Sequence, residues 1–447
     1  MVQIKKTKMK RSKINISKER YHDVLTDFIS VINNILDEDD VFEQHMNEHF
    51  NDKETKELEY NYPVLLKHQT SYGINHIINN NKIFILDDVC HYNYDKTTEI
   101  QPTYETIHVK RNQLENIMTY GYLYIHYKKK PFVVQIAFNY DNKAPIFIHY
   151  LEEDEKLAHE MLNVFHRVAK ETNFLKGEKI CINTKGVPEF LDYKKLDWDD
   201  IILEKSVKDK IIKNVIYPIA NKSNYDKYDL PWKRGVLLSG SPGVGKTLQG
   251  KVLCNVLDTT LIWITAQNYD GGSFEIDSIY EMARNLAPSV VFIEDIDLIG
   301  KERDFGNNTS ILGELLTQLD GITDNSGVFT IATTNKPAML DEALANRPAR
   351  FDVTIKIKPP NEEGRRILID KMLKPVDKIT IEEMDNTIRK TDGFTGAHIK
   401  ELIINARKTS FLSQQDGIIT DDILKQSLKE LEESFEKYKE EQQEYCG

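Results

Sequence analysis

The segment Gly240–Thr247, which reads GSPGVGKT, constrains the fold of this chain more than any other feature. It follows the short apolar run Gly235–Ser239 and precedes the helical pattern LQGKVLCNVL, so it matches the phosphate-loop consensus G-x-x-x-x-G-K-[ST] in its required context. The glycines let successive backbone N–H groups turn toward an anion, and the positive end of the next helix adds to that field. We expect Lys246 to contact the β- and γ-phosphates and the Thr247 hydroxyl to ligate Mg²⁺. The segment therefore predicts a nucleotide-phosphate site in an α/β fold.

Polar residues follow two later apolar strands. Glu294 and Asp295 come directly after Ser289–Ile293, and Asn335 lies just after Val328–Thr333. Carboxylates at the C-terminal end of a parallel strand, beside a phosphate loop, can hold Mg²⁺ and orient an attacking water. A polar amide there can bridge that water and the γ-phosphate. The pattern therefore predicts a parallel sheet with its chemistry at one edge.

A pair of arginines, Arg347 and Arg350, lies in a loop before the strand pattern Val353–Ile357. Two interpretations stay open. The arginines form a structural ion-pair cluster, or they reach the γ-phosphate bound by a neighbouring subunit, where a guanidinium stabilises the charge of the transition state. The second interpretation requires the chain to assemble with copies of itself.

The composition indicates a globular protein with an acidic total. Lys and Arg number 59 and Asp and Glu 71, which gives a net charge of −12. An acidic total argues against general coating of nucleic acid, for which a basic surface is the usual footprint. No stretch approaches the roughly 18 apolar residues of a membrane span, and the N-terminus lacks the apolar segment of a secretory signal. The four cysteines have no metal-binding spacing, so we expect a reduced, cytoplasmic compartment.

Changes in composition and in the spacing of apolar residues divide the chain into five segments. Residues 1–15 form a basic tail, which is either simply solvated or a contact for nucleic acid or an acidic partner. Residues 16–185 are predicted to form a separate α/β or α+β domain that binds a client or partner, and 186–197 a linker. Strands and helices alternate over 198–358, whereas 359–447 shows helical patterns. Expected elements of the N-terminal domain are helices within 18–50 and over Glu155–Glu171, and strands at Ile83–Leu86, Thr106–Val109, Tyr122–Tyr127, Phe132–Phe138, Ile146–Tyr150 and Lys179–Ile182, the third and fourth of these as a hairpin.

The motifs between about residues 197 and 412 resemble, in their order, those of the AAA family of ATPases within the AAA+ proteins. The series is WDDI, GSPGVGKT, FIEDID, LLTQLDGI, IATTN, LDEAL, RPARFD and GFTGAHI. The resemblance implies a large P-loop subdomain over 198–358, with a parallel sheet flanked by helices, and a helical lid with a C-terminal helix over 359–447. It also implies a homo-oligomeric ring, usually a hexamer, that binds ATP and Mg²⁺ between its subunits.

The same resemblance assigns roles to individual residues. Nucleotide binding falls to the phosphate loop, to the segment after Trp198 and to the start of a lid helix: Ser241, Pro242, Gly243, Val244, Gly245, Lys246, Thr247, Leu248, Asp200, Ile201, Ile202, Gly396 and Ala397. The implied metal residues are Thr247, Glu294 and Asp295. The implied catalytic residues are Glu294, Asp295, the sensor Asn335, and the arginine fingers Arg347 and Arg350, which act on a neighbouring subunit.

Three departures from the family pattern bear on these roles. The pair Glu294-Asp295 reverses the usual Asp-Glu, an order that resembles the EDID of a mitochondrial AAA protein that assembles a respiratory complex. Which carboxylate serves the metal and which polarises water stays open, and the shorter Asp295 can tighten the site or slow hydrolysis. Ala349 replaces a glycine, and Asp200-Ile201-Ile202-Leu203 replaces Asp-Ile-Gly-Gly.

The segment expected at a central pore reads Asn268-Tyr269-Asp270-Gly271-Gly272. Tyr269 is the candidate aromatic that grips an extended polypeptide, and Asp270 stands where threading members carry an apolar residue. The other interpretation is that Tyr269 only caps a shortened loop. Whether a client is threaded therefore stays open.

The leading prediction is an ATP-hydrolysing ring motor that remodels, unfolds or disassembles a protein client chosen by the N-terminal domain, as a chaperone does. The sequence contains no HExxH, which excludes the metalloprotease branch of the family. One alternative is a nucleic-acid-associated motor, which the acidic total and the motif series disfavour. Another is a nucleotide-gated scaffold with slow turnover, which the order Glu294-Asp295 motivates.

Overall fold

The structure, a computed structural model, describes residues 40–138, 144–183, 186–265, 275–299, 311–319, 324–336, 351–373, 381–413, 418–420, 422–431 and 433. The chain divides into two compact units. The second unit holds everything from His166 onward and also takes two short segments from earlier in the chain, Tyr62–Gly73 and Thr106–Ile117.

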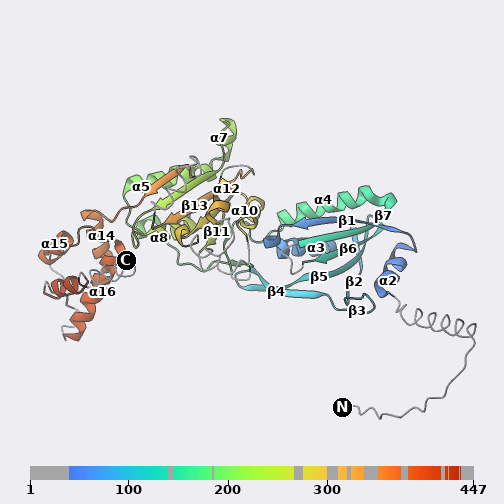
Figure 1. Cartoon of the computed structure of the whole chain (residues 1–447), viewed down its shortest axis with the longest axis horizontal. Coiled ribbons are helices and arrows are strands. Elements are labelled where there is room, and N and C mark those ends of the chain that lie inside the picture. The colour runs from blue at the N-terminus through green and yellow to red at the C-terminus, as the bar shows by residue number, and fades with distance from the viewer. Residues whose placement is uncertain are drawn as a thin grey trace, which may run out of the picture. The chain divides into compact units, whose positions relative to one another are not determined.

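The N-terminal part is built on a sheet with strand order β1-β7-β6-β5-β2-β3, in which β4 also pairs with β5 (Figure 1). The strands are β1 (Thr55–Tyr62), β2 (Phe84–Tyr92), β3 (Glu99–Ile100), β4 (Thr103–Lys110), β5 (Gln113–Tyr127), β6 (Lys130–Ala137) and β7 (Ala144–Leu151). The helices are α2 (Val41–Phe50), α3 (Lys67–Asn80) and α4 (Glu155–Glu171), with short 3-10 turns η1 (Val64–Leu66) and η2 (Glu152–Asp154). The predicted hairpin is confirmed, because β5 and β6 pair antiparallel with Tyr127 opposite Lys130. Helix α4 has the bounds that its amphipathic pattern predicts.

Helices α2 and α4 cover opposite faces of this sheet. Successive residues of a strand point to opposite sides, so the residues of β5 that contact each helix show which face it covers. Tyr127 of β5 packs against Phe84 with ring centroids 4.8 Å apart, and Phe84 stacks on Phe165 of α4. Tyr124 of β5 instead belongs to a separate buried cluster with Phe50 of α2. The face toward α2 is thus lined by the even-numbered residues at the end of β5.

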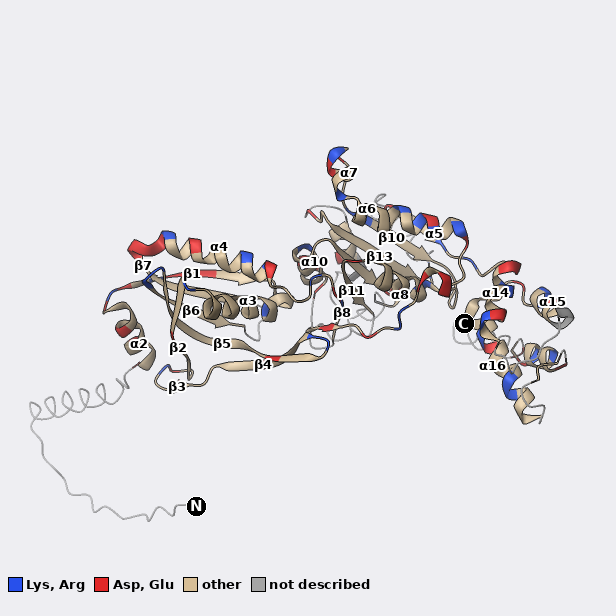
Figure 2. Ribbon diagram, turned by 180° about the vertical axis from the view of Figure 1, so that it is seen from behind, with Lys and Arg blue, Asp and Glu red and all other residues tan. Residues whose placement is uncertain are grey.

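The second unit contains a sheet with strand order β14-β10-β13-β12-β11-β8-β9, in which all neighbours are parallel except β8 and β9. Its strands are β8 (Lys179–Ile182), β9 (Pro188–Phe190), β10 (Arg234–Ser239), β11 (Thr260–Ile264), β12 (Ser289–Ile293), β13 (Val328–Thr334) and β14 (Val353–Lys356). Its helices are α5 (Lys205–Ile211), α6 (Tyr217–Ala220), α7 (Lys222–Lys227), α8 (Lys246–Val256), α10 (Ile276–Asn285), α11 (Ile296–Ile299) and α12 (Ile311–Leu319), with a 3-10 turn η3 (Trp198–Asp200) and a short π-helix η4 (Ile212–Ile216). Strands β11 and β13 carry no charged residue, and charges gather on helices such as α5 and α7 (Figure 2). The predicted parallel sheet flanked by helices is confirmed.

The sequence-based assignment is wrong at the start of this sheet. Lys179–Ile182, assigned to the N-terminal domain, is β8 and pairs in parallel with β11. Pro188–Phe190, assigned to the linker, is β9 and pairs antiparallel with β8. The reason is that a short strand's own residues do not specify its partner, and the partner of β8 lies some 80 residues later in the chain.

The core of the parallel sheet includes residues from the N-terminal part of the sequence. Leu65 and Leu66 of η1 are buried in one cluster with Ile276, Ile279 and Met282 of α10. Apolar burial of this kind stabilises by roughly 1.5–3 kcal/mol per large side chain. The segment Tyr62–Gly73 is therefore part of the core of the second unit rather than of a free-standing domain.

The lid consists of α14 (Glu362–Met372), α15 (Ile381–Lys390), α16 (Gly396–Leu412) and helical residues 422–431. Ile369, Ile388, Ile399 and Ile403 are its buried centre. The predicted helical lid is confirmed in these residues. None of the helices that the structure describes is both long and apolar enough to cross a bilayer.

Gly250 fixes how closely α8 approaches the sheet. A Cβ atom at this position would lie 2.6 Å from ring atoms of both Trp263 and Phe292. We expect Gly250→Ala to lower the free energy of unfolding by up to about 2 kcal/mol, because overpacking that costs about 1–3 kcal/mol outweighs a gain in helix propensity of about 1 kcal/mol. Urea unfolding measures it. Gly396→Ala is the matched control, since a Cβ there would meet only ordinary contacts of 3.6 Å or more; stabilisation by both variants would contradict the packing argument.

Candidate functional site

The phosphate loop joins the buried strand β10 to helix α8, and its backbone requires glycine at several positions. A Cβ at Gly240 would lie 2.3 Å from the carbonyl oxygen of Ile357. Gly243 and Gly245 have φ angles of +79° and +101°, which disfavour residues with a Cβ atom. Gly245 is also the N-cap of α8, so the helix begins directly at Lys246. The sequence thus brings the positive end of a helix to the loop.

Lys246 is almost wholly buried, with 6% of its surface exposed. Its ammonium donates to the carbonyl oxygens of Gly240 (2.7 Å) and Ser241 (3.0 Å) and to Oδ1 of Asn335 (2.6 Å). Burial lowers the pKa of Lys246, and nearby carboxylates oppose that shift. The three hydrogen bonds hold the ammonium group of Lys246 inside the loop.

The two carboxylates after β12 point to different partners. Oε1 of Glu294 accepts a hydrogen bond from the Thr247 hydroxyl, and its Oε2 accepts one from the indole of Trp263 at 3.3 Å. Oδ1 of Asp295 instead accepts from Nδ2 of Asn335 at 3.0 Å. Glu294 therefore lies beside the hydroxyl expected at the metal, and Asp295 beside the expected sensor.

Asp295 has an unusual backbone and an altered acidity. Its φ angle is 49°, and its N–H donates to the Thr333 hydroxyl at 2.9 Å. Burial raises the pKa of Asp295, the negative charges of Glu294 and Asp297 raise it further, and Lys246 opposes the change. A carboxylate with a raised pKa accepts a proton from water more readily than an ordinary aspartate does.

Asp297 holds Thr334 and Asn335 in place. It is buried, and its Oδ1 accepts from the Thr334 hydroxyl at 3.0 Å and from the backbone N–H of Asn335 at 3.1 Å. The sequence showed this residue as the last of the EDID run but gave it no separate role. Its effect is to fix the strand end from which the Asn335 amide projects.

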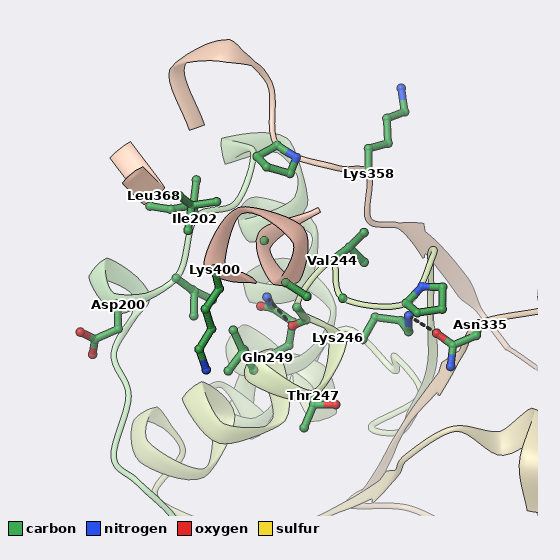
Figure 3. A pocket seen from close by; sticks show the side chains of 18 of the residues that line it. Asp200, Ile202, Val244, Lys246, Thr247, Gln249, Asn335, Lys358, Leu368 and Lys400 are labelled. Atoms are coloured by element: carbon green, nitrogen blue, oxygen red, sulfur yellow. Dashed lines mark hydrogen bonds between the residues drawn. The ribbon is translucent and has the colours of Figure 1, made fainter. Parts of the chain in front are cut away.

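These elements surround a cavity of about 430 Å³ (Figure 3). Among the predicted nucleotide residues, those lining it are Asp200, Ile201, Ile202, Pro242, Gly243, Val244, Gly245, Lys246, Thr247, Leu248, Gly396 and Ala397, together with Asp295 and Asn335. Ser241 and Glu294 are not among the lining residues, but they contact Lys246 and Thr247. The lid contacts the loop directly: the Ala397 N–H donates to the Gly243 carbonyl at 3.3 Å.

Several lining residues were not predicted. They are Gln249, Lys358, Pro360, Leu368, Met372 and Lys400. Leu368 and Met372 come from one face of α14 and Lys400 from α16, so the signal available was the lid's helical periodicity. Gln249 lies one turn into α8, and its Oε1 is buried without a hydrogen-bond partner among the described residues.

The cavity fits a nucleoside triphosphate in size and in chemistry. Small-molecule sites typically measure about 300–1,000 Å³. Lys246, Lys358 and Lys400 supply positive charge for phosphates, Ile202 and Leu368 supply an apolar wall, and the orphaned Gln249 oxygen is an acceptor for a donor on the ligand. For Mg²⁺, the oxygen ligands that it prefers are offered by Thr247, Glu294 and Asp295.

Three predicted site residues, Tyr269, Arg347 and Arg350, lie outside the described residues, as does Ala349. Asp352, two residues after Arg350, is described. It accepts from the Gly235 N–H at 2.7 Å and lies 3.5 Å from the Arg234 guanidinium.

Comparison with known proteins agrees with this site. Residues 236–359 match the family described as "ATPase family associated with various cellular activities (AAA)". A cell division cycle ATPase of Plasmodium falciparum is 28% identical over 246 residues, which are 53% of this chain and 20% of that protein. A 26S proteasome regulatory subunit homolog of Methanothermobacter marburgensis is 32% identical over 272 residues, 57% of this chain and 71% of the relative. The ATP-dependent zinc metalloprotease FtsH 2 of Thermoanaerobacter sp. is 34% identical over 218 residues, 46% of this chain and 42% of the relative.

The coverage differs among these relatives: the chain spans about a fifth of the Plasmodium protein but 71% of the archaeal homolog. The archaeal match extends over more residues than the family match itself. Together with the phosphate loop, the paired carboxylates and the lid around one cavity, it shows that the chain belongs to the AAA family of ATPases and is an enzyme that hydrolyses ATP.

Proposed function

We propose that this chain is one subunit of an ATP-driven ring, a hexamer, that remodels, unfolds or disassembles a protein client. The observation that carries the proposal is the nucleotide cavity between phosphate loop and lid, in which the lid's Gly396 and Ala397 approach the loop. Relatives named for protein-degrading assemblies, a 26S proteasome regulatory subunit homolog and an ATP-dependent metalloprotease, favour a protein as the object that is moved.

The hydrogen bonds support one assignment of roles to the residues of the site. Lys246 neutralises phosphate oxygens, and Thr247 and Glu294 hold Mg²⁺, since their oxygen atoms already lie together. Asp295 and Asn335 orient the attacking water, and Asp295 takes its proton. When bound, Mg²⁺ supplies positive charge to the phosphates. Arg347 and Arg350 complete the site of a neighbouring subunit, and Tyr269 contacts the client at the ring centre.

The N-terminal part is proposed to select the client and to move with the nucleotide site. Its segment Tyr62–Gly73 supports this role, because Leu65 and Leu66 share a buried cluster with α10 and with residues of the central strands. Packed cores transmit displacement because they deform little. A change at the nucleotide site is therefore expected to reach the segment Tyr62–Gly73, which belongs to the same unit.

A trap experiment tests the proposal. Tagged Asp295→Asn protein, incubated with ATP and cell extract, is expected to retain a protein client, since nucleotide binds and is not cleaved. Lys246→Ala is the matched control and should retain none. Sedimentation in the presence of ATP should show a six-fold assembly. Retention that is equal in both variants, with or without ATP, would contradict an ATP-driven remodeller.

The alternatives make different predictions in the same preparation. A nucleic-acid motor would show hydrolysis stimulated by DNA or RNA and binding that weakens steeply with salt. A nucleotide-gated scaffold would show equal, slow phosphate release for the wild type and for Lys246→Ala. The acidic total and the satisfied hydrogen bonds around Asp295 favour neither alternative.

A further inference from the structure

We propose that His49, Asp87 and His126 form a binding site for a divalent transition-metal ion of the Zn²⁺ class in the N-terminal unit. The site involves none of the residues around the nucleotide cavity. Its three candidate ligand atoms, one from each residue, lie within 4.8 Å of one another. The three residues come from α2, β2 and β5, and β2 and β5 are hydrogen-bonded neighbours (Figure 1).

A break in strand register places Asp87 in this group. The pairing of β2 with β5 shifts between Leu86 and Asp88, so Asp87 is an extra residue with no partner opposite it. Such a β-bulge re-aims the side chain of the extra residue. Here the side chain points to His126 of β5, with Oδ2 2.7 Å from Nδ1. The bulge therefore puts the carboxylate on the sheet face that α2 covers.

His49 is held in the orientation that a metal ligand needs. Its Nε2 lies 3.1 Å from the carbonyl oxygens of both Ile125 and Phe132. A carbonyl only accepts, so Nε2 carries the proton and Nδ1 carries the lone pair. Donation from the second ring nitrogen to a backbone carbonyl is the usual support of a metal-ligating histidine.

The lone pair of His49 faces a carboxylate rather than a donor. Its Nδ1 lies 3.9 Å from Oδ2 of Asp87, the same oxygen that His126 contacts. Neither of these two atoms donates a hydrogen to the other, and a cation bound between them would accept the lone pairs of both. A bound cation satisfies all three side chains at once.

The donor set fits Zn²⁺ in particular. Two imidazole nitrogens and one carboxylate oxygen, with a further position open to water, form a recurrent zinc site with metal–ligand distances of about 2.0–2.2 Å. Ligand atoms around such an ion are roughly 3.5 Å apart, so the 3.9 Å distance from His49 to Asp87 has to shorten and the 2.7 Å distance from His126 to Asp87 has to lengthen. Asp87 and His126 can move, since about a third of each side chain is exposed (35% and 36%), whereas the side chain of His49 is 8% exposed and fixed.

Metal binding is measured on the full chain without nucleotide, using Zn²⁺ by calorimetry and Co²⁺ by visible absorption. We expect one ion per chain above the binding of the variants, a raised melting temperature with Zn²⁺, and Co²⁺ spectra without thiolate-to-metal charge transfer. His126→Gln and Asp87→Asn, both at partly exposed positions, should each weaken binding at least about tenfold. His159→Gln, at an exposed position on α4, is the matched control and should bind as the wild type does.

Equal Zn²⁺ binding by the wild type, His126→Gln and Asp87→Asn would overturn the proposal, as would a thiolate band in the Co²⁺ spectrum. A wild type that binds no Zn²⁺ while folded would show instead that the group is only a hydrogen-bonded cluster. His49→Gln is kept as a secondary variant, because it also removes the contacts with Ile125 and Phe132.

Discussion

Replacing Lys246 by alanine is expected to reduce ATP hydrolysis to background. The substitution removes the one ammonium that lies inside the loop, held there by the Gly240 carbonyl and the Asn335 amide. Loss of one such electrostatic contact commonly costs roughly 10²–10³-fold in rate, and here nucleotide affinity falls as well. Phosphate release at steady state and nucleotide binding by fluorescence titration measure the two effects.

The control for this variant is Lys251→Ala, which removes a lysine from the same helix that does not line the cavity. It should keep wild-type affinity and rate. Circular dichroism checks that both variants are folded. Wild-type turnover in folded Lys246→Ala protein would show that the loop is not the site of hydrolysis.

Asp295→Asn is expected to leave ATP affinity within a few-fold of the wild type and to cut turnover by about 10²–10⁴-fold. The amide oxygen can still accept from Asn335, so the local geometry persists while the proton acceptor is lost. Glu294→Gln is expected to raise the Mg²⁺ concentration needed for half-maximal rate, because Glu294 contacts Thr247. Rates measured across a Mg²⁺ titration separate the two variants, and the reverse outcome would exchange their roles.

The pH profile is a second readout of the same assignment. Because the pKa of Asp295 is raised, chiefly by burial, its protonated fraction grows at a higher pH than in an ordinary aspartate. The rate should therefore fall on acidification earlier than a carboxyl pKa of about 4 would give. The residual activity of Asp295→Asn should lack this acidic limb, which a purely structural effect would leave in place.

Much of the nucleotide site was predictable because its chemistry is local in sequence. The loop from Gly240 to Thr247 must combine positive φ angles, a lysine and a hydroxyl within a few residues, and a short consensus captures that. The contact of Glu294 with Trp263 was not predictable. It depends on β11 lying next to β12, a pairing between strands that are separated in sequence by helix α10.

In the N-terminal part, too, elements that depend on distant segments were not predictable from local sequence. Helix α3 was not predicted, because its sequence KHQTSYGINHIINN mixes polar residues with only three isoleucines, Ile74, Ile77 and Ile78, all of which are buried. Strand β5 was predicted only at its apolar end, Tyr122–Tyr127, whereas it begins at Gln113. Polar positions in these elements are set by packing and pairing with distant segments, which local periodicity does not record.

The interleaving of segments in the second unit limits how such a chain can change during evolution. Residues 62–73, which precede α4 in the sequence, contribute Leu65 and Leu66 to the core beside α10. Strand β8, which follows α4, adds a strand to the parallel sheet. An exchange of the N-terminal part at a single crossover at residue 185 would remove strand β8 and two core leucines from the second unit, and a crossover at residue 198 would remove β9 as well. New binding specificities of the first unit are therefore expected to arise by substitution within residues 40–61, 74–105 and 118–165, or by insertion at their loops, rather than by replacing the whole part.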